Sequence, residues 1–268
     1  MIIDYHMHLR DEHEELAHRA SAVEPFVTAA RLAGVDEIGF TEHVYYFEQT
    51  RRLWTVPYHL ERCGHDLDDY VTAVSDAKAR GLPVKLGLEV DYEPGREDET
   101  IAILEPYTWD FLLGSVHFVD GLAVDGGPPR LIDAVGVEGA WHRYFDVLAD
   151  AARSGVFDVL SHPDLVKIFG DRVPTFDYGP VADAIAEGGV AVEVSTAGLR
   201  KPVGELYPDA AFLRACHDRA VPIMTASDAH VPQLVGRDFD LARVLLESVG
   251  YETVTVFDRR RPSQVAVG

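Results

Sequence analysis

The chain begins with a stretch, IIDYHMHLRDEH at residues 2–13, that sets three histidines within eight positions. Its apolar start predicts a short strand over 2–5, and His6 and His8 follow that strand directly. Side chains two residues apart on an extended strand point to the same face, so these two imidazoles can share one metal ion. Chain ends are usually frayed and carry no function. The pattern therefore predicts an ordered first strand that leads into a metal site.

The composition bounds the class of protein. The 268 residues are 47% apolar and contain no evident linker, which predicts a single α/β domain over residues 1–268. No apolar run approaches the ~20 residues of a membrane span, and no signal peptide is evident. Cys63 and Cys216 are the only cysteines, so a disulfide framework is excluded and a reducing cytoplasm is the expected location.

The charge of the chain restricts its partners. A net charge of −21 argues against nucleic acid, because a phosphate backbone requires a basic surface. Most of the 45 acidic side chains are expected to form a solvated surface. An anionic substrate would then need a local reversal of the field, and bound divalent metal ions are the strongest candidates for it.

Short apolar runs alternate with segments of helical period along the chain. The runs predict strands at 2–5, 37–41, 84–90, 110–116, 156–161, 189–194 and 221–226, with a late strand at 252–256 that closes or flanks the sheet. The other segments predict helices at 22–34, 61–80, 97–104, 137–154, 179–187, 209–219 and 238–249. Left-handed C-caps are expected at Gly34, Gly81, Gly155 and Gly188. Seven or eight such units predict a closed parallel barrel; a doubly wound open sheet is the second choice, although it lacks its usual nucleotide motif.

Polar side chains follow the predicted strands one after another. In a barrel, all these positions face the C-terminal mouth, where active sites of this architecture lie. They are His6 and His8, Glu42 and His43, Glu89 and Asp91, His117, His162, Glu193, Ser195 and Arg200, and Asp228 and His230.

A mixture of imidazole and carboxylate is suited to zinc, iron or manganese. Nine candidate ligands exceed the needs of one tetrahedral ion and predict two or, more readily, three ions, with Glu89 as the bridging carboxylate. The nine are His6, His8, His13, His43, Glu89, His117, His162, Asp228 and His230. The alternative for Asp228 and His230 is a polar turn, and for His13 a solvated helix start. Glu42 is expected to orient a ligating imidazole, and Asp4 is a further candidate for that role.

These residues stand in motifs that resemble the polymerase-and-histidinol-phosphatase (PHP) superfamily and, within it, the PHP-type histidinol-phosphatases. The broader signals are His-x-His at 6–8, TEH at 41–43, the glutamate after the third strand and SDAH at 227–230. The narrower ones are GLEVDY at 87–92, GSVHF at 114–118, SHPDLVKIFG at 161–170 and STAGLRKPVGELYP at 195–208. Together they span nearly the whole chain in the order expected of the family.

The resemblance implies a distorted (β/α)7 barrel with three metal ions at its mouth. One ion would take His6, His8, Glu89 and Asp228, a second Glu89, His117 and His162, and a third His13, His43 and His230. The loop that carries His13 is about one residue shorter than the family pattern, which makes this ligand the least secure of the nine.

The resemblance also implies an activity, the hydrolysis of L-histidinol phosphate to L-histidinol and phosphate in histidine biosynthesis. A hydroxide bridging two ions would attack phosphorus. Arg200 would bind phosphate oxygens, with Lys167 and Lys201 as further candidates, although each could be an ordinary surface cation. Asp228 or a nearby histidine such as His230 would protonate the leaving oxygen.

Four other functions remain open at this level. They are a PHP phosphoesterase for another small phosphoester, such as a nucleotide or sugar phosphate, a metal-dependent amidohydrolase, a proofreading nuclease module and a metal-binding scaffold without catalysis. The net charge disfavours the nuclease, and the amidohydrolase pattern does not call for ligands after the second and third strands. The sequence predicts neither the identity of the metal nor the oligomeric state.

Overall fold

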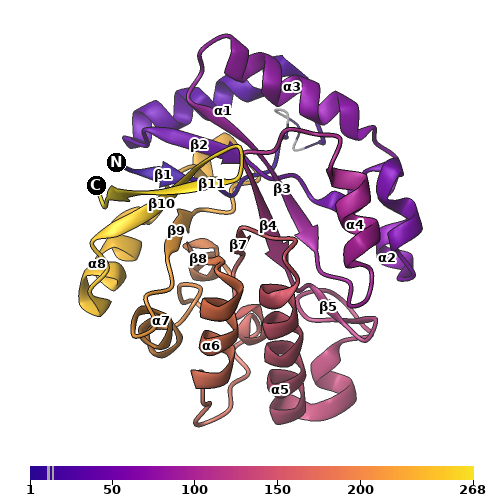
Figure 1. The fold of residues 1–268 in the computed structure, drawn as a ribbon, viewed down its shortest axis with the longest axis vertical. Coiled ribbons are helices and arrows are strands. Elements are labelled where there is room, and N and C mark those ends of the chain that lie inside the picture. Colours follow the sequence, from indigo (N-terminus) through magenta and orange to yellow (C-terminus); the bar gives the residue numbers. More distant parts are fainter. Residues whose placement is uncertain (11–12, 14) are drawn as a thin grey trace.

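The computed structural model describes residues 1–10, 13 and 15–268. Seven parallel strands form one sheet with helices around it (Figure 1). In sheet order the strands are β1 (Ile3–Asp4), β2 (Glu37–Phe40), β3 (Val84–Asp91), β4 (Phe111–Ser115), β7 (Val159–Leu160), β8 (Ala191–Ser195) and β9 (Ile223–Ala226). Backbone hydrogen bonds from Tyr5 N to Thr225 O (3.2 Å) and from His8 N to Ala229 O (2.9 Å) join the first strand to the last. The sheet is therefore a nearly closed barrel, as the sequence predicted.

The helices lie on the outside of this barrel, between successive strands. They are α1 (Ala20–Ala33), α2 (Pro57–Leu60), α3 (Leu67–Ala79), α4 (Glu97–Leu104), α5 (Leu131–Arg153), α6 (Gly179–Gly188), α7 (Ala210–His217) and α8 (Phe239–Val249). Short 3-10 helices sit mostly in the loops at the strand ends: η1 (Val44–Tyr46), η2 (Glu48–Leu53), η3 (Leu165–Lys167), η4 (Ala197–Arg200) and η5 (Pro232–Leu234). A two-stranded hairpin of β5 (Phe118–Val119) and β6 (Leu122–Ala123) follows β4.

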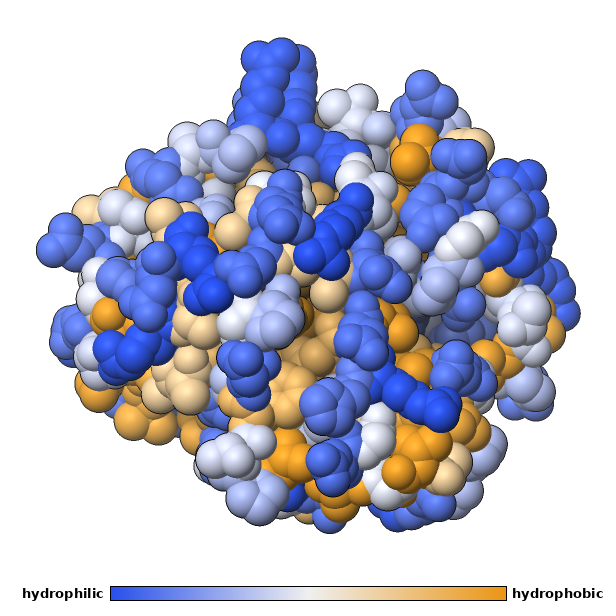
Figure 2. Space-filling view, turned by 60° about the horizontal axis from the view of Figure 1, so that its bottom comes forward, coloured by the Kyte–Doolittle hydropathy of each residue, from blue (hydrophilic) through white to orange (hydrophobic). Residues whose placement is uncertain are grey.

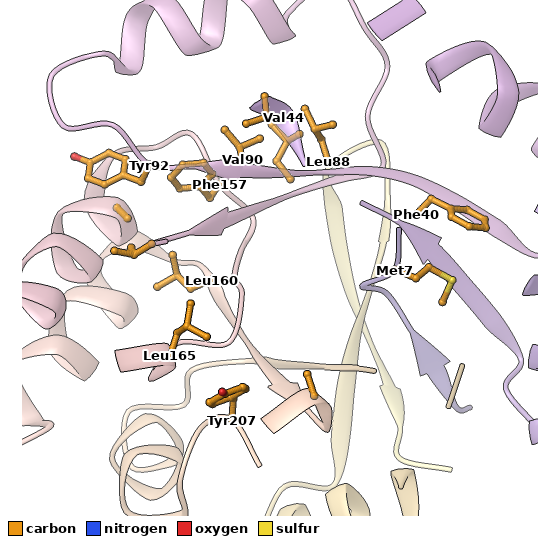
Figure 3. Packing of buried hydrophobic residues seen from close by; sticks show 14 of the residues in the cluster. Met7, Phe40, Val44, Leu88, Val90, Tyr92, Phe157, Leu160, Leu165 and Tyr207 are labelled. Carbon is orange, nitrogen blue, oxygen red and sulfur yellow. The ribbon is translucent and has the colours of Figure 1, made fainter. Parts of the chain in front are cut away.

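The alternation of side chains along β3 shows how the core and the site share one strand. Leu88 and Val90 point to the outer side of the barrel, where Figure 3 shows them gathered with Val44 of η1. Glu89 and Asp91 lie between these positions and therefore point to the opposite side, into the barrel. All four side chains are buried. The apolar side chains of β3 pack outside the barrel, and its polar side chains are available to the site inside it.

The late strand predicted at 252–256 flanks the barrel and does not join its sheet. It is β10 (Thr253–Asp258), which pairs antiparallel with β11 (Arg261–Ala266). The ring of Phe257 stacks on that of Phe111 with centroids 5.7 Å apart, and Arg260 N donates to Asp110 O at 2.8 Å. Because Asp110 lies just before β4, this hairpin covers the N-terminal end of the barrel. Ligands are therefore expected to enter the barrel at its C-terminal mouth.

Two predicted helices have different bounds in the structure. The helix expected at 61–80 is shorter: residues 61–66 are not helical and it begins as α3 at Leu67, because Gly64 N and His65 N both donate to Tyr46 O, at 3.0 and 2.9 Å, while α2 ends before this range at Leu60. The Asp66 side chain accepts from Asp68 N and starts α3. The helix expected at 137–154 starts earlier, at Leu131, with an interruption where Gly136 has φ 74°.

The predicted C-cap at Gly188 is displaced by one residue. Positive φ angles follow the helices at Gly34, Gly81 and Gly155, as expected, but α6 continues through Gly188 and is capped by Gly189 at φ 67°. Gly188 has another reason to be glycine, because a Cβ there would lie 2.0 Å from Ala152 O of α5. It allows close packing of the two helices.

The face shown in Figure 2 is mostly hydrophilic, with hydrophobic side chains gathered in smaller areas between the charged ones. This agrees with a surface that carries most of the charged residues. Among the residues that the structure describes, no helix is long and apolar enough to cross a membrane.

Candidate metal centre

The structure brings eight of the nine predicted ligands together at the C-terminal mouth of the barrel. They come from the ends of six strands, and their ligand atoms form four overlapping groups of three, each within 4.8 Å. The groups are His6, His8 and Asp228; His6, Glu89 and His162; His43, Glu89 and His117; and His8, His43 and His230.

Glu89 lies at the centre of this cluster. Its Oε2 atom is 2.7 Å from His43 Nδ1 and 3.3 Å from His6 Nε2. Its Oε1 atom is 3.0 Å from His162 Nε2 and 3.5 Å from His117 Nε2. His8 Nε2 also lies 3.6 Å from Oε2. The two carboxylate oxygens thus face separate sets of imidazoles, which is the geometry expected of a bridging ligand.

Asp228 follows β9, the strand that closes the barrel beside β1, and faces His6 and His8. Its Oδ1 atom is 3.3 Å from His8 Nε2 and 3.8 Å from His6 Nε2. The turns that carry Asp228 and His162 both have positive φ angles, 53° and 25°. For residues other than glycine such backbone is strained and is found preferentially at functional sites.

A second ring of carboxylates orients the imidazoles. Buried carboxylates bind the Nδ1 atoms of three histidines and turn their Nε2 atoms inward, an arrangement typical of metal ligands. The pairs are His6 with Glu193 (2.8 Å), His8 with Glu42 (3.2 Å) and His117 with Asp91 (2.7 Å). Glu42 has the role expected from the sequence. Asp4 does not, because its oxygens accept from Ser227 N and Gly236 N, both at 2.8 Å, and hold the turn after β9.

Several buried atoms at the centre of the cluster lie close to one another but form no hydrogen bond of good geometry among the described residues. They are His6 Nε2, His8 Nε2, His43 Nδ1 and Glu89 Oε2. A buried polar atom without a partner destabilises a fold by about 1–3 kcal/mol. A cluster of buried imidazole nitrogens and carboxylate oxygens of this kind fits the ligand preferences of divalent zinc, iron or manganese.

The electrostatics of the cluster keep its carboxylates ionised. Burial alone would raise the pKa of Glu89, but the adjacent His43, His6 and His117 hold it well below its usual value. Burial likewise opposes ionisation of Asp228, and its histidine neighbours hold its pKa well below the ordinary range. Both side chains are therefore anionic at neutral pH, the form that binds metal.

The third predicted ligand set, His13, His43 and His230, is not brought together as a whole. His43 and His230 lie near each other, with ring centroids 6.2 Å apart, but His13 lies in an exposed turn outside the four groups. The group that contains both includes His8, whose Nε2 atom also faces Asp228 and Glu89. A third ion would have to share that atom with the first.

The predicted phosphate-binding cations take three different positions. Lys167 is fully buried, paired with Asp164 at 2.7 Å and bonded to Leu206 O at 2.7 Å, so it is not available to a substrate. Arg200 does not line the cavity over the cluster; its guanidinium donates to the carbonyls of Thr196 and Ser227. Lys201 lines the cavity.

That cavity, of about 720 Å³, has six of the predicted ligands in its lining: His43, Glu89, His117, His162, Asp228 and His230. Aromatic rings, among them Tyr45, Tyr58 and Phe118, form part of its wall, and Glu61 and Asp125 add negative charge. Sequence reasoning missed Arg10, which also lines it, although the residue stands only two positions after His8. Glu193 stands at a predicted strand end, but the sequence alone assigns it no role, because its contact with His6 spans 187 residues.

Comparisons with known proteins agree with this geometry. The family model of the PHP domain matches residues 4–197. A Deinococcus radiodurans protein named "Probable histidinol-phosphatase" is 34% identical over 250 residues, which cover 91% of this chain and 93% of that protein. The histidinol-phosphatase of Bacillus subtilis is 30% identical over 77% of this chain and 86% of its own length. A histidinol phosphate phosphatase from Lactococcus lactis, solved with zinc, L-histidinol and phosphate, is 22% identical, covers 98% of both chains and has a TM-score of 0.76.

Proposed function

Because the chain belongs to the PHP domain family, we propose that it is a metal-dependent phosphomonoesterase that hydrolyses L-histidinol phosphate to L-histidinol and phosphate. The observation that carries the proposal is the position of Glu89, whose two oxygens face separate sets of imidazoles. The names of the relatives from Deinococcus radiodurans and Bacillus subtilis support the choice of substrate.

The ligand sets assign residues to the ions. His6, His8 and Asp228 would hold one ion and His117 and His162 another, with Glu89 available to both sets. Divalent ions held in this way lower the pKa of bound water from 15.7 to about 7 and neutralise charge on the phosphoryl group. The third ion predicted on His13, His43 and His230 has less support, because only the last two of these lie together.

The chain's own acid–base groups serve the leaving oxygen. Asp228 Oδ1 lies 3.5 Å from His230 Nδ1, and both residues line the cavity. One of this pair takes up the proton that the attacking water loses and passes it to the ester oxygen as its bond to phosphorus breaks. Lys201 lines the cavity and would contact the substrate, whereas Arg200 supports the turn that carries Asp228 by donating to Ser227 O.

The wall of the cavity suits the organic part of L-histidinol phosphate. The rings of Tyr58 and Phe118, with centroids 5.6 Å apart, offer apolar faces to an imidazole. Asp125 and Glu61 offer carboxylates to an ammonium group. A nucleotide or sugar phosphate lacks that amine, so this wall favours histidinol phosphate over the other small phosphoesters.

Phosphate release from L-histidinol phosphate by the purified protein tests the proposal. The assay is run beside nucleotides, sugar phosphates and an amide substrate, with a chelator and then with added Zn²⁺ or Mn²⁺. Chelator-sensitive preference for L-histidinol phosphate is the expected result. Metal-dependent hydrolysis spread evenly over other phosphoesters would overturn the substrate, and hydrolysis of the amide alone would favour an amidohydrolase.

A further inference from the structure

His59 is a fully buried histidine that belongs to none of the four ligand groups. It lies in the short helix α2, and neither of its ring nitrogens has a hydrogen-bond partner among the residues that the structure describes. A buried polar atom without a partner opposes folding, and an apolar ring would fill the same space without that cost. The position of the two nitrogens therefore requires an explanation other than packing.

Aromatic side chains hold the ring of His59 in place. Its centroid lies 4.7 Å from that of Trp54 and 5.1 Å from that of Tyr45, which stacks on it. The ring of Phe118 meets it edge to face at 4.7 Å. An imidazole enclosed on several sides has little freedom to turn, so its nitrogens keep a set direction.

One of these nitrogens lies beside a carboxylate that orients a predicted metal ligand. His59 Nε2 is 3.9 Å from Asp91 Oδ1, and the other oxygen of Asp91 has no hydrogen-bond partner among the described residues. The same Oδ1 atom is 2.7 Å from His117 Nδ1, and His117 Nε2 is 3.5 Å from Glu89 Oε1. A series of polar contacts thus runs from His59 through Asp91 and His117 to the metal cluster.

The protonation of His59 suits a contact with a carboxylate. Burial lowers the pKa of His59, and the negative charge of Asp91 offsets this only in part. The ring is therefore neutral at pH 7 and carries a single N–H group, which can lie on Nε2 and point toward Asp91. A distance of 3.9 Å is longer than a hydrogen bond, so in this geometry the N–H acts on the carboxylate as a dipole.

Resting on the metal-dependent function proposed above, we propose that His59 is a positioning residue for His117 and acts on it through Asp91. A carboxylate that binds a ligating imidazole fixes the orientation of that ring and raises its basicity. His59 gives this carboxylate a polar neighbour in otherwise aromatic surroundings. Removal of the nitrogens of His59 leaves Asp91 less firmly held, and the ion assigned to His117 and His162 is bound more weakly.

Three substitutions separate the nitrogens of His59 from its ring. H59Q places an amide N–H near the position of Nε2, H59N places one near Nδ1, and H59F keeps a ring without nitrogen. The proteins are loaded with Zn²⁺, and the ions per chain are counted by mass spectrometry after equilibration with increasing concentrations of a chelator. D91N is the positive control, and H142Q, which changes an exposed histidine of α5, is the negative one.

The proposal predicts a specific order of the variants. One ion per chain is expected to bind about three- to tenfold more weakly in H59F and H59N, a smaller effect than the roughly 10- to 100-fold loss in D91N, because His59 acts one contact further from the ion. H59Q and H59N both lack the ring, so their difference reports on the nitrogen position alone. H59Q is expected to stay within about twofold of the wild type, and H142Q is expected to match it. The visible spectrum of the Co²⁺-loaded protein is expected to change in H59F and H59N and not in H59Q.

A role in packing alone gives the opposite order. H59F would then bind metal like the wild type, whereas H59Q and H59N would lose stability in urea and release all ions equally. That order, or Zn²⁺ binding like the wild type in all three variants, overturns the proposal. A wild-type protein that retains no Zn²⁺ overturns both this proposal and the metal-dependent function. Failure of the histidinol phosphate assignment appears only in the substrate panel, and the order of the variants still decides the role of His59.

Discussion

Glu193 Oε2 lies 2.8 Å from His6 Nδ1, although the two residues are 187 positions apart in the chain. Both side chains are fully buried, and the contact joins β8 to the second residue after β1 inside the barrel. It determines which nitrogen of His6 points to Glu89 and Asp228. The metal site therefore depends on a carboxylate that is not itself one of its predicted ligands.

The first prediction follows from this pair. Replacement of Glu193 with Gln removes the charge that orients His6, so metal affinity is expected to fall by about 10- to 100-fold. Competition with a chromophoric chelator measures it. The control E187Q changes an exposed partner of Arg153 and is expected to leave the affinity unchanged. Equal affinity in E193Q and E187Q would contradict the orienting role.

Lys167 is predicted to act in stability and not in phosphate binding. Replacement with Met leaves Asp164 as a buried charge without its partner, a change that typically destabilises a fold by about 3–5 kcal/mol. Urea unfolding of the metal-free protein measures the loss. Phosphate binding by the folded K167M protein is expected to stay within about twofold of wild type; a loss in binding without a loss in stability would restore Lys167 as a substrate ligand.

Glu93 is predicted to make stability depend on pH. Burial, and then the nearby Asp91, raise the pKa of Glu93 from 4.5 to about 7, and Arg96 offsets this only in part. The folded state then binds a proton that the unfolded state releases between these two values, so the contribution of Glu93 to stability falls as pH rises from about 4.5 to 7. E93Q is expected to gain stability over wild type at pH 8 relative to pH 4, measured by urea unfolding in chelator. A difference that is the same at both pH values would contradict the shifted pKa.

Asp125 is predicted to recognise the organic part of the substrate. D125N is expected to raise KM for L-histidinol phosphate by about tenfold, because one charged hydrogen bond to the ammonium is lost. KM for p-nitrophenyl phosphate, which has no amine, is expected to stay nearly constant. The matched variant E61Q asks whether the second carboxylate of the cavity shares this role. Equal losses for both substrates in D125N would place Asp125 in the common chemistry instead.

Much of the fold could be predicted because local patterns persist in the structure. The helix expected at 97–104 has those bounds in the structure, and the parallel strands lie within a few residues of their predicted ranges. The errors have tertiary causes. The helix predicted at 61–80 begins only at Leu67, because Gly64 and His65 bond to Tyr46, a contact that no local pattern indicates.

The residues of the candidate site were likewise predictable only in part. Strand-end position alone indicated His6, Glu89 and the other clustered ligands, because parallel strands in a barrel all end at one mouth. Strand-end position could not show that Lys167 is buried or that Arg10 lines the cavity. Whether a cation is buried against an aspartate or turned to a cavity depends on which loops pack together.

The sequence by itself determined the alternation of strand and helix, the set of imidazoles and carboxylates at the strand ends, and the family. These follow from periodicity and residue chemistry, which are local properties. Only the tertiary structure decided that Glu89 stands between two sets of histidines, that Glu193 orients His6, and that Arg10 lines the cavity. Barrel closure brings strands far apart in the chain within a few ångströms of one another, and those distances are not encoded in any single segment.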